Sequence, residues 1–273
     1  MQPFAVAFGP IIAAKPDEVI RNRAMLELLM PPELSGQIVA FLLATSFMGS
    51  LITVAFGIGG GALLLAVMAV TMPPLALIPI HGVVQLGSNL GRAIMFVRYT
   101  FWPALPWFVV GSLIGVGIGG NIAMNIPPWV VQMGVGFFIV WSVLSRPPRW
   151  LREWPLLTGL ISSFLTMFFG ATGMFVANYS KLLNLARHNH VATHATLMTV
   201  QHLLKTFAFG VLGFAFAPWL PFIAAMVVVG LIGTFAGRVV LTRMTDARFH
   251  RALDIVLLLI AMRLIWSGIT TEF

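Results

Sequence analysis

The chain has 273 residues, of which 59% are hydrophobic and 9% are charged, and its mean hydropathy is +0.97. A soluble domain usually carries about 25% charged residues, so this composition excludes an ordinary soluble enzyme or binding domain. The net charge of +8 does not indicate a nucleic-acid partner, because most basic residues flank hydrophobic segments. The absence of cysteine excludes disulfides, thiolate metal ligands and thiol redox chemistry.

The chain divides into an N-terminal arm over 1–35, a first transmembrane repeat over 36–145, a cytoplasmic linker over 146–154 and a second repeat over 155–273. Charge-free apolar stretches long enough to cross a bilayer run through both repeats. The apolar start of the arm is not a cleavable signal, because no basic region precedes it. We therefore predict an all-α polytopic protein of the cell (inner) membrane, embedded in the lipid bilayer.

Each repeat contains five hydrophobic helical segments. In the first repeat they cover 36–56, 60–72, 77–97, 104–123 and 128–145, and in the second 155–169, 173–184, 190–213, 218–240 and 249–270. The second segment of each repeat has roughly 12 residues and spans only about 18 Å, less than the ~30 Å hydrocarbon core. If all ten segments cross, the basic loops fall on one side, which the positive-inside rule makes cytoplasmic, and both termini lie outside.

The two repeats align at a common offset of 113 residues. At this offset FGIGGG (56–61) lies over FGATGM (169–174), and His81 meets His194. Arg92 then meets Lys205. Five crossings per repeat make the repeats inverted, an arrangement typical of secondary transporters.

The glycine motifs predict breaks between the first and second segments of each repeat. Glycine lets the chain bend and lets a ligand approach the backbone. The unpaired N–H groups and the positive dipole end of each short helix then favour an anion. Close packing of helices through small residues is the alternative explanation. The candidate binding residues of these breaks are Gly57, Gly59, Gly60, Gly61, Gly170, Thr172 and Gly173.

The third segments carry a polar stripe with a cation. His81, Gln85, Ser88 and Arg92 share one helical face, and His194, Gln201 and Lys205 take the same positions in the second repeat. Asn89 lies beside the stripe. No acidic residue occurs between Glu33 and Glu153, so an anionic substrate is the expected counter-ion. The alternative is that both cations snorkel to an interface or bond backbone carbonyls.

Two roles stay open for the paired histidines His81 and His194. They are either packing residues with internal hydrogen bonds, or groups that bind the anion or carry a coupled proton. His190 and His194 also have the i, i+4 spacing of metal ligands. No third carboxylate or thiolate lies nearby, so we predict no metal site and no cofactor.

The GIGGG motif, the GATG motif of the second half and the duplicated apolar layout resemble the sulfite exporter TauE/SafE family over roughly residues 36–270. The resemblance implies transport of a small sulfur-containing anion (sulfite, sulfoacetate or a related organosulfonate), often as export from the cytoplasm. It places the glycines of both breaks at the substrate. Thr172 and Met174 stand where the first motif has glycines, so the second motif departs from the first.

Two other functions remain as alternatives to anion transport. A cation or metal transporter would need carboxylates or a His/Asp cluster at mid-membrane, and the middle of this chain lacks acidic residues. A membrane-embedded metalloenzyme would depend on the His190 and His194 pair. We predict a transporter rather than an enzyme, and nothing in the sequence indicates an oligomeric state.

Overall fold

A computed structural model describes residues 31, 33–56, 59–123, 126–145, 153–241 and 247–272, and this part of the chain is helical without β-strands. The first half forms α2 (Gly36–Phe56), α3 (Gly60–Thr71), α4 (Pro74–Met95), α5 (Leu105–Ala123) and α6 (Pro128–Leu144). The second half forms α8 (Pro155–Phe169), α9 (Gly173–Leu182), α10 (Arg187–Val211), α11 (Leu220–Leu241) and α12 (Ala247–Glu272). Short 3₁₀ turns cover Val97–Tyr99, Trp102–Ala104 and Ala217–Trp219. The all-α prediction is confirmed.

The helices match the ten predicted segments, with differences of a few residues at their ends. α4 begins at Pro74, three residues before the prediction, because proline suits the first position of a helix, where its missing N–H is not needed. α10 begins at Arg187, also three residues early. α9 stops at Leu182, and Asn184 follows with a positive φ of 49°.

Most of the predicted N-terminal arm and of the predicted linker lies outside the described residues. The domain boundaries at 36–145 and 155–273 therefore stay predictions.

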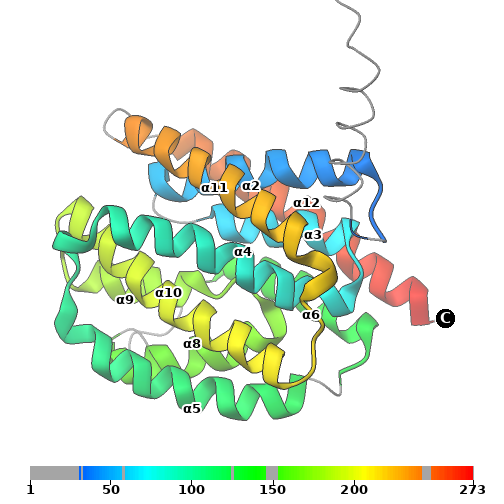
Figure 1. Cartoon of the computed structure of the whole chain (residues 1–273), viewed down its shortest axis with the longest axis horizontal. Helices are drawn as coiled ribbons and strands as arrows, with labels where there is room; N and C mark the ends of the chain where they lie inside the picture. The colour runs from blue at the N-terminus through cyan, green and yellow to red at the C-terminus, as the bar shows by residue number, and fades with distance from the viewer. Residues whose placement is uncertain are drawn as a thin grey trace, which may run out of the picture.

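The longer helices pack in pairs (Figure 1). α2 lies with α11 on one side, α5 lies with α8 on the other, and α4 and α10 run between them. α6 pairs with α12. The equivalent helices of the two halves are α2 and α8, α4 and α10, α5 and α11, and α6 and α12. Replacing each helix by its equivalent turns the α5–α8 contact into the α11–α2 contact, and it leaves the α4–α10 and α6–α12 pairs unchanged. The contacts thus have the pattern that two equivalent halves would produce.

The equivalent helices α4 and α10 run antiparallel. His81, early in α4, contacts His202, late in α10, with ring centroids 6.1 Å apart. Beyond the other end of α4, the hydroxyls of Thr100 and Thr196 lie 3.1 Å apart. Inverted repeats require antiparallel equivalent helices, and the inverted orientation across a membrane stays a prediction.

Glycines let the outer helix pairs approach at the backbone. In α5, a Cβ on Gly115 would meet the carbonyl oxygen of Leu160 in α8 and would lie 2.9 Å from the backbone nitrogen of Phe164. In α11, a Cβ on Gly237 would lie 2.7 Å from the carbonyl oxygen of Leu51 in α2. Membrane helices associate through such small residues, because lipid offers no hydrophobic driving force between helices.

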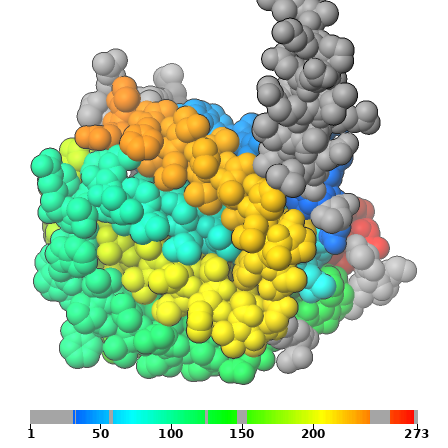
Figure 2. Space-filling view, viewed as in Figure 1, coloured from blue at the N-terminus to red at the C-terminus, as the bar shows by residue number. Residues whose placement is uncertain are grey.

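Large apolar side chains cover the outside of the protein, while many polar side chains lie inside. Figure 2 shows the face formed by α4, α5, α10 and α11. Exposed apolar residues on these helices include Leu90, Ile94, Trp107, Leu113, Leu203, Phe207, Val228 and Ile232. A bilayer solvates such a surface, whereas water would not.

Three helical stretches of the described residues are both long and apolar enough to cross a bilayer. They are Gly36–Ala55, Trp102–Ala123 and Ala217–Val239. α3, α6 and α8 are apolar but shorter, with 12, 17 and 15 residues. The long helices α4 and α10 are less apolar because each carries a stripe of buried polar side chains.

Candidate functional site

A cavity of about 160 Å³ lies between the two halves of the protein. Helices α3, α4 and α6 and Thr53 of α2 line one side, with Gly59, Gly61, Ala62, His81, Gln85, Asn89, Arg92, Ser142 and Val143. The second half lines the other side, with Gly170, Ala171, Gly173, Met174, His194, Met198, His202, Asp254 and Leu257. One water occupies roughly 30 Å³ in the liquid, so the cavity has room for a small solute with water around it.

Both predicted breaks open into this cavity. Gly59 precedes α3 with φ 104°, and Gly170 precedes α9 with φ 72°. Side chains with a Cβ rarely adopt such angles, so glycine is required at both positions. Gly57 lies outside the described residues. The N-terminal ends of α3 and α9 therefore approach one space from the two halves, as the repeat alignment predicts.

A histidine of the third helix holds the start of the short helix in each half. His81 Nε2 lies 3.1 Å from the carbonyl oxygen of Gly61, and His194 Nε2 lies 3.3 Å from that of Gly173. A carbonyl oxygen only accepts, so each Nε2–H donates. The Nδ1 of His81 is then an acceptor, and it is buried without a hydrogen-bond partner in the described structure.

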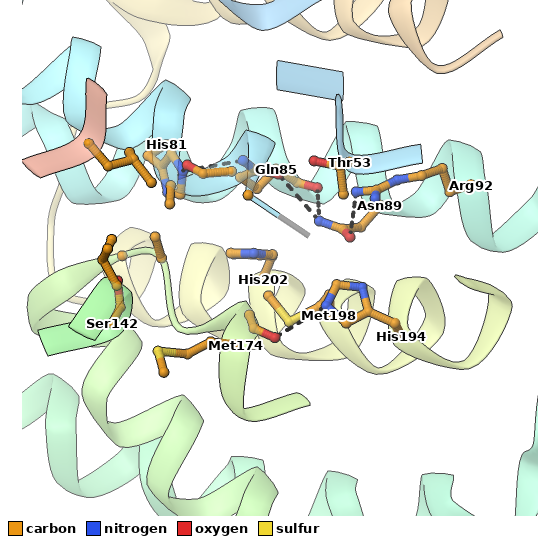
Figure 3. Close-up of a pocket in the computed structure, with 18 of the residues that line it drawn as sticks. Thr53, His81, Gln85, Asn89, Arg92, Ser142, Met174, His194, Met198 and His202 are labelled. Atoms are coloured by element: carbon orange, nitrogen blue, oxygen red, sulfur yellow. Dashed lines mark hydrogen bonds between the residues drawn. The ribbon is translucent and has the colours of Figure 1, made fainter. Parts of the chain in front are cut away.

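A ladder of hydrogen bonds on α4 leads from Gln85 to Arg92, and all its members are buried (Figure 3). The amide nitrogen of Gln85 lies 3.3 Å from His81 Nε2, but that nitrogen already donates its hydrogen to Gly61, so this contact is not a rung of the ladder. The amide nitrogen of Asn89 donates to the carbonyl oxygen of Gln85 at 2.7 Å, and Arg92 Nη2 donates to Asn89 Oδ1 at 2.8 Å. Arg92 Nε also donates to the carbonyl oxygen of Ser88 at 3.3 Å. The ladder fixes the guanidinium at the edge of the cavity.

The described structure contains no ion pair to Arg92. The bonds to Ser88 and Asn89 engage two of the five N–H donors of the guanidinium. Asp254 of α12 lines the same cavity, but its side chain is exposed. Arg92 is only 2% exposed, so a buried cation here favours an anionic ligand.

Several predicted binding residues do not line the cavity. A Cβ on Gly60 would meet the carbonyl oxygen of Gly49, so Gly60 serves close packing of α2 on α3. The hydroxyl of Ser88 lies 3.0 Å from that of Ser50. Lys205 is fully buried at the α4–α10 contact, where a Cβ on Gly82 would lie 2.7 Å from its Cε.

In the second half, Gln201 and Thr172 do not line the cavity. They are hydrogen-bonded to each other and hold the chain at the glycine break before α9. Gln201 Nε2 donates to the Thr172 hydroxyl at 2.7 Å, and the Ser162 hydroxyl donates to Gln201 Oε1 at 2.7 Å. Thr172 immediately precedes α9. These three buried side chains connect α8, α10 and the N-terminus of α9.

Cavity-lining residues absent from the predicted set are mostly apolar or lie on other helices. Met198 occupies the stripe position that Gln85 holds in the first half, and His202 occupies that of Asn89, so the repeat alignment already contained both. Thr53 lies just before the first glycine motif, and Met174 is the last residue of the second. Ser142 and Asp254 come from α6 and α12, which carry no pattern that points to the cavity.

The histidine pair proposed as a metal alternative forms no metal cluster in the described residues. The rings of His190 and His194 stack with centroids 6.5 Å apart. No group of three or more His, Cys, Asp or Glu side chains with metal-binding geometry occurs in the part of the chain that the structure describes.

The sequence model of the family described as "Sulfite exporter TauE/SafE" matches residues 42–264. Neither the curated proteins nor the solved structures provide a match to this chain. The matched range covers most of the chain and includes every described residue that lines the cavity. The chain therefore belongs to the sulfite exporter TauE/SafE family, a family of membrane transporters of sulfur-containing anions such as sulfite.

Proposed function

We propose that this family member exports sulfite or a small organosulfonate from the cytoplasm across the inner membrane, and that the anion binds in the cavity between the halves. The observation that carries the proposal is the meeting of two helix N-termini and one buried arginine at a single cavity. Each of these elements contributes positive potential.

The N-terminal ends of α3 and α9 supply backbone N–H groups to the anion. The first N–H groups of a helix have no partner within the helix, and they point along its axis. Gly59, Gly61, Gly170 and Gly173 leave this backbone uncovered at the cavity. An oxyanion with oxygens on several sides, such as sulfite, can accept from both ends at once.

Arg92 supplies the full positive charge. A guanidinium presents paired donors that match an oxyanion and keeps its charge in a buried site. Gln85 and Asn89 hold it in place through the hydrogen bonds along α4. His81 and His194 fix the two helix starts and border the anion.

The remaining predicted residues act on the site indirectly. Gly60, Ser88, Thr172 and Gln201 hold the helices that carry the cavity walls. When it is protonated, Lys205 adds positive potential from the α4–α10 contact, where its charge would act on His81 and His202.

A thermal-shift screen of the purified protein in detergent tests the proposal. The ligands are sulfite, sulfoacetate, taurine, thiosulfate, sulfate and chloride at constant ionic strength, with divalent cations as the contrast. A ligand raises the stability of the folded state by RT ln(1 + [L]/Kd). We expect sulfite or an organosulfonate to raise the Tm most. A shift with divalent cations alone would instead support a metal transporter.

Arg92→Gln identifies the binding site within this screen. Loss of a charge-assisted hydrogen bond costs roughly 1.5–3 kcal/mol, so the Kd should rise about tenfold or more. Arg98→Gln is the matched control, because Arg98 is exposed and its Nη2 donates to the hydroxyl of Tyr99 at 2.6 Å. An equal loss of affinity in both variants would contradict binding at Arg92. Sulfite uptake by inside-out vesicles then tests the direction of transport.

A further inference from the structure

Three basic side chains at the α4–α10 contact each carry a buried nitrogen that has no hydrogen-bond partner in the described structure. They are His81 at Nδ1, His202 at Nδ1 and Lys205 at Nζ. The rings of His81 and His202 meet edge to face at 80°, and both line the cavity. Lys205 lies near enough to both rings for a charge on its ammonium to act on them. We refer to these three residues as the basic cluster.

Space for the lysine is provided by a glycine on the facing helix. A Cβ on Gly82 would lie 2.7 Å from Lys205 Cε and 3.5 Å from Nζ. Any larger residue at position 82 would displace the lysine side chain. The ammonium position is therefore built into the contact between α4 and α10.

In the first half of the chain, the two residues equivalent to Lys205 and His202 are hydrogen-bonded to each other, whereas Lys205 Nζ and His202 Nδ1 have no hydrogen-bond partner in the described structure. Arg92 donates to Asn89 Oδ1 at 2.8 Å. At the repeat offset, Lys205 replaces Arg92 and His202 replaces Asn89. Arginine keeps its proton in a buried site, whereas a buried lysine or histidine readily exchanges its own. The second-half pair can therefore change its charge, and the first-half pair cannot.

The groups that face the cluster are basic. α4 contributes Arg92 and the rest of α10 contributes His194, and both lie near enough for their charge to act on His202. The packed segments of α5 and α8 contain no charged residue. Among described residues, the carboxylate that lines the cavity is Asp254, which is exposed and forms no ion pair with the cluster.

A proton on the cluster thus lacks a buried counter-charge from the described residues. An unpaired buried charge is costly, and an anion in the cavity would remove that cost. We propose that His81, His202 and Lys205 form a proton-binding site that takes up one proton from water when the anion binds and returns it when the anion leaves. The inference rests on the proposed function, because the transported anion supplies the counter-charge. Anion and proton then cross the membrane together, with no covalent bond to the protein.

Proton uptake on anion binding can be measured by titration calorimetry of the purified full-length protein. The heat is recorded in two buffers of different ionisation enthalpy at one pH and ionic strength. Sulfoacetate serves as the probe, because its acidic groups stay ionised at neutral pH, and sulfite is corrected for its own protonation. We expect uptake of about one proton per bound anion.

The double variant His202→Asn with Lys205→Arg reproduces the pair of the first half. It should bind the anion with a Kd within tenfold of the parent, but proton uptake should fall to near zero and the Kd should lose its pH dependence. If the arginine does not fit beside Gly82, the single variant Lys205→Met serves as the second test. It should also reduce the proton uptake. His188→Gln is the control, because His188 is exposed at the start of α10.

The outcomes separate the two proposals. Anion binding without proton uptake in the parent protein would overturn the proton-binding site and leave the proposed function intact. Unchanged uptake in the folded double variant or in Lys205→Met would also overturn it. If none of the sulfur anions binds the parent protein, the proposed function fails, and the inference fails with it.

Discussion

The Nε2 of His81 lies 3.1 Å from the carbonyl oxygen of Gly61 in the first turn of α3. The equivalent His194 has the same relationship, at 3.3 Å, with Gly173 at the start of α9. Each long polar helix thereby holds the N-terminus of the short helix in its own half. Because α4 and α10 also contact each other, the two held ends are brought to one cavity.

Cysteine accessibility should reveal the orientation of the two halves. The parent chain contains no cysteine, so each single substitution can be labelled without background. With ten crossings, Val97→Cys and Ala186→Cys should react with an impermeant maleimide only after permeabilisation. Asn121→Cys and Ala215→Cys should react in intact cells. Labelling of Val97→Cys and Ala215→Cys from the same side would contradict the inverted arrangement.

Gly60→Ala should destabilise the protein, because the added Cβ would meet the carbonyl oxygen of Gly49 in the neighbouring helix. Overpacking of this kind costs roughly 1–3 kcal/mol, so we expect the Tm in detergent to fall by about 5 °C or more. Gly117→Ala is the control, since a Cβ there meets nothing within 4 Å. That variant should keep or raise the Tm, because alanine favours a helix over glycine.

Gly170→Ala should weaken anion binding beyond its effect on stability. The new Cβ would lie 2.8 Å from Leu65 Cδ1 and 3.4 Å from His81 Nδ1, and it would enter the cavity wall. Gly213→Ala is the control for backbone strain. Gly213 also has a positive φ, at 93°, but a Cβ there would meet nothing within 4 Å. We expect both variants to lose stability and only Gly170→Ala to raise the sulfite Kd several-fold. Equal Kd values in the two variants would exclude a role for Gly170 in the site.

Gln201→Leu should lower both stability and anion affinity, although Gln201 does not line the cavity. The change leaves the hydroxyls of Ser162 and Thr172 without their bonds to Gln201, and an unpaired buried hydroxyl costs roughly 1–3 kcal/mol. Loosening Thr172 also frees the start of α9. Ser162→Ala removes one of these bonds and should give a smaller loss of Tm in the same melting experiment. If Gln201→Leu melts like the parent protein, this network does not support the break.

The sequence predicted where the helices lie and which of them carry polar side chains. Length and hydrophobicity along the chain decide these features, because a helix that crosses lipid must satisfy its own backbone. The glycine motifs and the 113-residue offset also paired His81 with His194 and Gly60 with Gly173, whereas the glycines that the two histidines contact are Gly61 and Gly173. Family membership was visible in the same motifs, since they are local in sequence.

Only the tertiary structure decided which side chains face the cavity. Lys205 and Arg92 hold equivalent sequence positions, but Arg92 lines the cavity and Lys205 lies against Gly82. Gln201 likewise turns to Ser162 and Thr172, whereas Gln85 faces the cavity. A helical repeat sets the face on which a residue lies. The neighbour that meets this face depends on how α4 and α10 pack together, and contacts between distant helices determine that packing.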